Sequence, residues 1–135
     1  KAVFLLNSYN INTATHVILG LPDETIDDWK TTIIEISKLP IKAIKFHYLY
    51  ILKNTPIVKL FEKGIIPILD SEIYIEALVN LIQYLREDIA IFRLFSDPEP
   101  GCIAPYFTMS KNEMLNRFRK ILNDKKIKQG TKYEN

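Results

Sequence analysis

The chain has 135 residues, of which 47% are hydrophobic and 25% are charged, and this fits one globular domain. The formal net charge of +2 is too small to indicate a nucleic-acid-binding protein. The single cysteine, Cys102, excludes an internal disulfide, a zinc site of several thiolates and an iron–sulfur cluster held by this chain alone. No apolar run approaches the ~20 residues of a membrane span. We therefore expect a cytoplasmic protein with neither membrane nor nucleic acid as a partner.

An apolar run followed by a glycine and a proline marks the first strand. Residues 13–19 are nearly continuously apolar and rich in β-branched side chains, which is typical of a buried parallel strand. Gly20 and Pro22 break this run, and Thr25 then fits the N-cap of a helix. The last turns of an earlier helix are expected within residues 1–10. The glycine–proline junction therefore predicts the carboxyl end of a strand, where the backbone can approach a ligand.

The remainder of the chain continues to alternate between strands and helices. Strands are predicted over residues 43–51 and 89–95, because both segments are rich in aromatic and β-branched residues. A long helix is predicted between them, beginning near Asp70, with an inner face of Ile73, Ala77, Leu81, Tyr84 and Leu85. The Ser-x-x-Glu spacing at residues 110–113 predicts a capping box that begins the last helix.

The order of these elements defines a fold class. Alternating strands and helices favour right-handed crossovers and a parallel sheet with helices outside it. A free-standing sheet of three strands leaves two edges and much of its surface uncovered, which predicts self-association through an edge. We therefore predict an α/β fold, namely the C-terminal portion of a partial (β/α) barrel with about three parallel strands and outer helices. The barrel core is expected over residues 1–123, and residues 124–135 are expected to be a polar, basic, fraying tail.

Three polar residues interrupt the apolar strands. Side chains alternate with a period of two along a strand, so if Ile18 faces the barrel interior, then His16 and Gly20 face it too. One interpretation is that His47 and Arg93 face the same interior and form a substrate or cofactor pocket with His16. The other is that each residue makes a structural hydrogen bond at a strand end or faces solvent.

Two further positions belong to the same end of the predicted sheet. Asp97 follows the third strand at the edge where the glycine–proline loop lies, and it is either a substrate-pocket residue or a turn-former. Tyr48 and Tyr50 alternate with His47 and Leu49, so one pair faces the helices and the other faces the interior. We favour the tyrosines against the helices, which places Leu49 with His47.

Five segments carry a resemblance to one family: HVILGLPDET at 16–25, IKFHYLYILKNTP at 44–56, RLFSD at 93–97, IAP at 103–105 and SKNEMLN at 110–116. In this order they resemble the C-terminal part of the core of radical S-adenosylmethionine (radical SAM) enzymes. The resemblance covers about residues 14–118 and is closest to uncharacterised bacterial Fe–S oxidoreductase-like members of the superfamily.

The resemblance implies which residues meet the cofactor. In the superfamily the matching strand ends in a GxIxGxxE-like pattern, whose apolar residue packs near the adenine. Ile18 and Gly20 match this pattern, although its first and last positions differ here. The following strand of the family also lines the cofactor pocket, which points to His47 and Leu49.

The CxxxCxxC loop that holds the family's [4Fe–4S] cluster has no counterpart in this chain. The resemblance therefore implies an intact parent enzyme that binds S-adenosylmethionine and a [4Fe–4S] cluster, and that reductively cleaves the cofactor to a 5′-deoxyadenosyl radical. This radical would abstract hydrogen from a substrate that the sequence does not identify. The chain alone is expected to hold no metal or cofactor and to be inactive, with the missing N-terminal half of the same protein as its partner.

Two other functions are compatible with the pattern. A fragment of a different (β/α) barrel enzyme would bind a phosphorylated small molecule at the N-terminus of the helix that begins near Thr25. A non-catalytic α/β interaction module would instead bury Tyr50, Ile51 and Phe92 in an oligomer.

Overall fold

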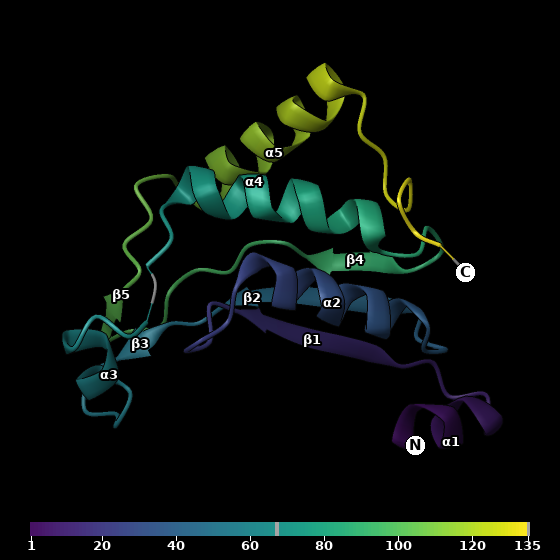
Figure 1. Ribbon diagram of the computed structural model, residues 1–135, viewed down its shortest axis with the longest axis horizontal. Helices are drawn as coiled ribbons and strands as arrows, with labels where there is room; N and C mark the ends of the chain where they lie inside the picture. Colours follow the sequence, from purple (N-terminus) through teal and green to yellow (C-terminus); the bar gives the residue numbers. More distant parts are fainter. Residues whose placement is uncertain (67, 135) are drawn as a thin grey trace.

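The computed structural model describes residues 1–66 and 68–134 (Figure 1). Five α-helices and a 3-10 helix alternate with short strands along this described part of the chain. In order, the elements are α1 (Ala2–Ser8), β1 (Ala14–Leu19), α2 (Ile26–Ser37), β2 (Ala43–Tyr48), β3 (Ile51–Leu52), α3 (Val58–Glu62), α4 (Ser71–Leu81), η1 (Ile82–Tyr84), β4 (Ala90–Arg93), β5 (Cys102–Ala104) and α5 (Lys111–Lys125).

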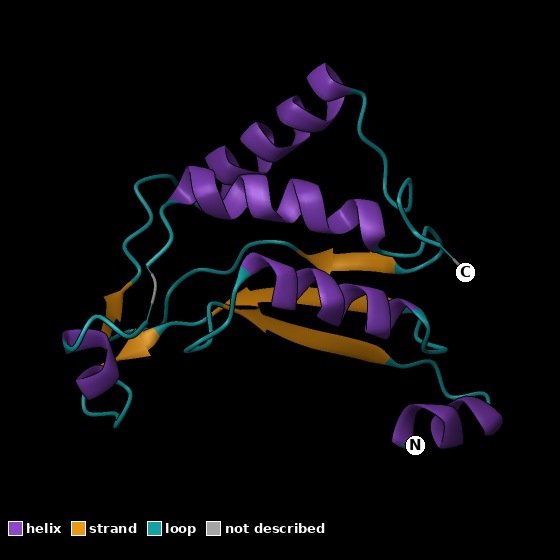
Figure 2. Cartoon of the chain, in the orientation of Figure 1, coloured by secondary structure: helices purple, strands orange, loops and turns teal. Residues whose placement is uncertain are grey.

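The main sheet has the strand order β1-β2-β4. β2 pairs in parallel with both of its neighbours, and Figure 2 shows the three arrows pointing the same way. The register aligns Ile18 of β1 with His47 of β2, and Lys45 of β2 with Arg93 of β4. The predicted α/β fold with three parallel strands and outer helices is therefore confirmed.

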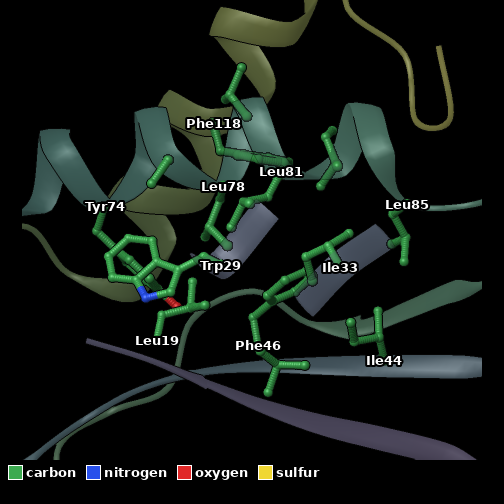
Figure 3. Close-up of a cluster of buried hydrophobic side chains, with 14 of the residues drawn as sticks. Leu19, Trp29, Ile33, Ile44, Phe46, Tyr74, Leu78, Leu81, Leu85 and Phe118 are labelled. Atoms are coloured by element: carbon green, nitrogen blue, oxygen red, sulfur yellow. The ribbon is translucent and has the colours of Figure 1, made fainter. Parts of the chain in front are cut away.

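One face of this sheet is covered by helices α2 and α4, with α5 packed beyond α4 (Figure 1). The main core lies between these helices and the strands (Figure 3). Leu19 and Phe46 from the sheet and Ile33 from α2 are all fully buried there. Burial of such a side chain contributes roughly 1.5–3 kcal/mol. This layer holds the strands in place and determines which of their side chains remain free on the other face.

The helix starts follow the capping signals in the sequence. Thr25 and Asp28 form a capping box at the start of α2, and Ser110 and Glu113 form the predicted one at the start of α5. Each box satisfies backbone N–H groups that have no partner within the helix. Asp70 caps α4 by accepting a hydrogen bond from the backbone N–H of Ile73.

The predicted inner face of α4 is wrong at its first position. Ile73 is 45% exposed, whereas its neighbours Tyr74 and Ile75 are buried. The ring of Tyr74 occupies the core position because it packs edge-on against Tyr48 and stacks on Phe107. Apolar residues lie around much of the circumference of this helix, so their spacing did not identify the buried face. The aromatic contacts of Tyr74 determine it.

The second and third predicted strands are shorter than expected. The strand predicted over 43–51 ends at Tyr48, and its last residue, Ile51, begins β3, which pairs antiparallel with β5. The strand predicted over 89–95 is reduced to Ala90–Arg93. No strand was predicted at β5, because its three residues lie among prolines and glycines and pair with a segment about fifty residues away.

The C-terminal segment does not fray as predicted. Ile127 packs against the main core, and the side-chain amide of Gln129 donates hydrogen bonds of 2.8 Å to the carbonyl oxygens of Arg86 and Ile89. The backbone N–H of Gly130 donates to the carbonyl of Ile82. Polar residues dock here because they donate further hydrogen bonds to carbonyl groups in and before the turn that precedes β4. Residue 135 of the predicted tail lies outside the described residues.

Candidate functional site

The face of the sheet opposite α2 and α4 is open and carries polar side chains. His16 and Ile18 lie on this face of β1, and Lys45 and His47 lie on the same face of β2. The register between β2 and β4 shifts just before Lys45, which makes Arg93 the partner of Lys45, and Arg93 lines a hollow together with His47. Ile18 is 46% exposed, and His16 and Arg93 are exposed as well. The structure therefore brings the three predicted polar residues and Ile18 together on one surface, which we call the open face.

His47 lies at the centre of the open face. Its ring stacks on that of His16, with 5.2 Å between centroids and 23° between planes. Burial lowers the pKa of His47, and the positive charges of Arg93, His16 and Lys45 lower this pKa further. Its Nε2 atom is buried and has no hydrogen-bond partner among the described residues. This nitrogen is thus left unsatisfied in the structure, and a neutral imidazole nitrogen either donates or accepts a hydrogen bond, depending on its tautomer.

A hollow of about 370 Å³ lies beside the carboxyl ends of β2 and β4, where the open face meets the following loops. It is lined by His47, Tyr50, Arg93, Ser96, Asp97, Glu99 and Lys111. The side chain of Asp97 is 76% exposed, and its Oδ2 lies 3.8 Å from Nζ of Lys111. The hydroxyl of Tyr50 donates a 2.6 Å hydrogen bond to the carbonyl of Ser96, which anchors the loop. Asp97 thus comes into the same hollow as His47 and Arg93.

Gly20 does not continue the alternation of β1. Its φ of +89° ends the strand, in a conformation that side-chain-bearing residues rarely adopt. A Cβ atom at this position would lie 3.2 Å from the ring of Tyr48. The expectation that Gly20 faces the interior with Ile18 is therefore wrong, because the backbone turns after Leu19. The positive φ and the close packing against Tyr48 both favour glycine here, and the predicted contact of Gly20 with the cofactor stays a prediction.

The side chains of Tyr48 and Leu49 pack in different parts of the molecule. Tyr48 is buried on the helix-covered side, as predicted, and its hydroxyl accepts a 2.9 Å hydrogen bond from the backbone N–H of Leu69. Leu49 lies just beyond the end of β2 and packs against a second, smaller core that includes Ile51 and Ala104. Leu49 is therefore adjacent to the open face along the chain, but its side chain stabilises the β3–β5 region.

The N-terminus of α2 is poorly suited to the phosphate site considered above. Both the backbone N–H and the hydroxyl of Thr25 donate 2.7 Å hydrogen bonds to the carboxylate of Asp28. Asp27 adds a second carboxylate in the first turn. These negative charges occupy the position that an anion would need. The surface proposed for an interaction module is also incomplete, because Ile51 is only 1% exposed, although Phe92 is 65% exposed.

Lys45 was not predicted as a site residue, although it lies on the open face. The period-two alternation that links it to His47 is visible in the sequence. A lysine within a strand is usually solvated, and only the register shows that Lys45 lies between His16 and Arg93.

Within residues 1–66 and 68–134, no group of three His, Cys, Asp or Glu side chains could hold a metal ion. Cys102 is a free thiol, half-buried in β5. No helix in these ranges is long and apolar enough to cross a membrane. The residues of this chain therefore do not fit an iron–sulfur cluster. The exposed, apolar side chain of Ile18 lies beside His47, whose Nε2 has no hydrogen-bond partner among the described residues.

The family model described as the Radical_SAM C-terminal domain matches residues 41–124. The chain belongs to this family and forms the C-terminal part of a radical SAM core.

Two relatives match nearly the whole chain. YtqA of Bacillus subtilis, an uncharacterised protein, is 30% identical over 131 residues, which cover 96% of this chain and 41% of YtqA. The uncharacterised protein MJ0486 of Methanocaldococcus jannaschii is 30% identical over 135 residues, which cover 98% of this chain and 42% of MJ0486. This chain thus spans about two fifths of the length of these relatives.

A solved structure shows the same fold. It is that of the archaeal Elp3 of Methanocaldococcus infernus with an N-terminal deletion. The superposition has a TM-score of 0.79 and covers 95% of this chain and 30% of that protein. The sequence identity is 17%, so this likeness concerns the arrangement of helices and strands alone.

Proposed function

We propose that this chain forms one wall of the active-site chamber of a radical SAM enzyme, and that the open face is the side that meets S-adenosylmethionine and substrate. The observation that carries the proposal is the partnerless, buried Nε2 of His47 beside the exposed side chain of Ile18. Helices cover one face of the sheet, and the other face holds an unsatisfied polar atom. This arrangement supports a ligand-binding role for the uncovered face.

Each residue then has a role that follows from its chemistry. Ile18 offers apolar contact to the adenine of the cofactor, and Nε2 of His47 forms a hydrogen bond to the cofactor or the substrate. Arg93 and Asp97 orient polar groups of the substrate at the strand ends. When bound, S-adenosylmethionine and a [4Fe–4S] cluster supply the radical chemistry. This domain binds and orients the cofactor and the substrate, and it excludes water from them.

The partner of this domain in the proposal is the N-terminal half of the same protein, which would supply the cluster ligands. Two observations support it. The chain spans only about two fifths of its relatives. In addition, Phe4 and Leu5 of α1 are 56% and 60% exposed, and neighbouring exposed apolar side chains of this kind mark surfaces that a partner covers. An N-terminal half that packs on α1 and β1 would cover these side chains and remove the free sheet edge.

The test uses the full-length protein, reconstituted with iron and sulfide. We expect the absorbance of a cluster, and 5′-deoxyadenosine when a reductant and S-adenosylmethionine are added. Ile18→Glu should weaken binding of S-adenosylmethionine at least tenfold, because a carboxylate replaces the apolar contact. The matched control is Ile26→Glu, because Ile26 is 45% exposed but lies on α2, on the outer side of the sheet.

Two results would contradict the proposal. If the reconstituted protein neither holds a cluster nor cleaves the cofactor, the enzymatic activity is refuted. If Ile18→Glu and Ile26→Glu bind S-adenosylmethionine with the same affinity, the open face is not the wall that meets the cofactor.

A further inference from the structure

Three basic residues form a row across the open face. His16 of β1 is the register partner of Lys45 of β2, and Lys45 is in turn the partner of Arg93 of β4. Adjacent strands lie about 4.8 Å apart, so the bases of these side chains are immediate neighbours. We call this set the basic row. It contains two permanent positive charges and a histidine, and His47 lies two residues further along β2 on the same face.

The basic row lacks an ion-pair partner among the described residues, although Asp97 and Glu99 line the hollow that Arg93 shares with His47. Neither Lys45 nor Arg93 forms an ion pair with any described residue. Lys45 is half-buried, so water screens its charge less than that of an exposed lysine. Like charges on neighbouring strands repel each other, and this repulsion is offset when an anion binds between them.

Positive charge continues from the basic row around the edge of the sheet. β4 is an edge strand, and a groove of about 650 Å³ separates it from α5. Arg93, Lys111 and Arg119 line this groove together with Asn112, and no aspartate or glutamate lines it. Lys111 approaches Asp97 at 3.8 Å, but both side chains are solvent-exposed, so this pair neutralises little of the charge. Phe92 adds an aromatic surface that is 65% exposed.

We infer that the substrate carries at least two phosphate groups, one bound by Lys45 and Arg93 on the open face and another by Lys111 and Arg119 in the adjoining groove. This inference rests on the proposed function. A single carboxylate would neutralise only one of the two permanent charges of the basic row and would leave the groove unoccupied, whereas phosphates in series supply enough negative charge for both. The fork of an arginine matches phosphate oxygens in pairs, and Phe92 offers contact to the uncharged part of the molecule.

The experiment measures binding of inorganic tripolyphosphate to the full-length protein by calorimetry. Arg93→Gln and Lys45→Gln should each weaken binding about tenfold, because each removes a charge-assisted hydrogen bond. Arg93→Lys, which keeps the charge but loses the fork, should weaken binding less than Arg93→Gln does. Lys128→Gln, which alters an exposed lysine on the C-terminal segment, should bind as the unmodified protein does. Malonate, which has two carboxylates, should bind more weakly than tripolyphosphate.

The same variants test whether the basic row binds a ligand or instead pairs with a carboxylate elsewhere in the full-length protein. Without a probe, Lys45→Gln should keep or raise the melting temperature, because it relieves repulsion within the basic row. A lowered melting temperature together with no binding of tripolyphosphate would overturn the inference, since the row would then pair with the protein itself. Adenosine diphosphate and a hexanucleotide are compared as sources of the phosphates, and tenfold weaker binding of either one to Arg93→Gln supports the inference.

Binding of S-adenosylmethionine distinguishes this inference from the proposed function. Arg93→Gln should leave the affinity for S-adenosylmethionine unchanged, while Ile18→Glu lowers it. If Arg93→Gln weakens the binding of both ligands equally, the basic row serves the carboxylate of the cofactor and the inference is wrong. A protein that cleaves S-adenosylmethionine but does not bind tripolyphosphate would refute the inference alone.

Discussion

The two faces of the β1-β2-β4 sheet are built from the same strands but differ in burial, polarity and charge. On β2, Ile44 and Phe46 point toward the helices and are fully buried. Lys45 and His47 alternate with them and point to the open face, where they are only half-buried. The covered face is apolar and tightly packed, whereas the open face is basic and holds an unpartnered nitrogen.

This difference shows how a single strand can serve stability and function at once. Neighbouring residues of a strand lie on opposite faces, so a change at one position leaves the other environment intact. The covered face determines whether the sheet forms. The open face, which contributes little to packing, is free to carry charges and unsatisfied polar atoms. Substitutions at adjacent positions should therefore have separable effects.

The largest effect is expected on the covered face. Phe46→Ala should lower the free energy of unfolding by about 3–5 kcal/mol, because it leaves a cavity between the sheet and the helices. Lys45→Ala, one residue earlier, should change it by less than about 0.5 kcal/mol. Urea denaturation followed by the fluorescence of Trp29, which is buried and is the only tryptophan, measures both. Equal losses for the two variants would show that the open face is packed as well.

An intermediate effect is expected where β1 ends. Gly20→Ala should lower the free energy of unfolding by about 2 kcal/mol, because the new Cβ strains the backbone and presses on the ring of Tyr48. Gly64→Ala is the matched control, since Gly64 also has a positive φ but open space around its Cβ position. That variant should cost about 1 kcal/mol, from backbone strain alone. Identical losses would mean that the contact with Tyr48 is unimportant.

The smallest effect is a pH dependence that originates on the open face. Burial and neighbouring positive charges lower the pKa of His47 below its usual 6.5. The folded state therefore resists protonation of His47, so the stability that it contributes is present above pH 6.5 and is lost as the pH falls below this value. His47→Asn should reduce the fall in melting temperature between pH 7.5 and 5.5. A fall as steep as in the unmodified chain would assign the dependence to other groups.

Carboxylates that also have lowered pKa values affect the stability of the fold in a separate pH range. Hydrogen bonds from Thr25 lower the pKa of Asp28, those from Ser110 lower the pKa of Glu113, and one from Arg86 lowers the pKa of Asp88. Their contributions are present above their usual values of 3.8 and 4.5 and are lost below them as the pH falls. The contribution of His47 can therefore be measured above pH 5, where these groups stay ionised.

Local sequence signals determined much of the architecture. The glycine–proline break after β1, the caps at Thr25 and Ser110 and the alternation of strands and helices were all readable, because each depends on residues a few positions apart. The same alternation predicted that His16 lies on the face of Ile18. It also made His47 and Arg93 candidates for a common surface, although it could not show that the strands carrying them are neighbours.

Tertiary structure decided what depends on partners far along the chain. The pairing of β3 with β5, the docking of Gln129 beside β4 and the burial of Tyr74 instead of Ile73 all require contacts between distant segments. The register that aligns Lys45 with Arg93 is equally non-local. A strand pattern specifies which residues alternate, but only helices packed on one face determine which set is covered, because burial is a property of the assembled layers.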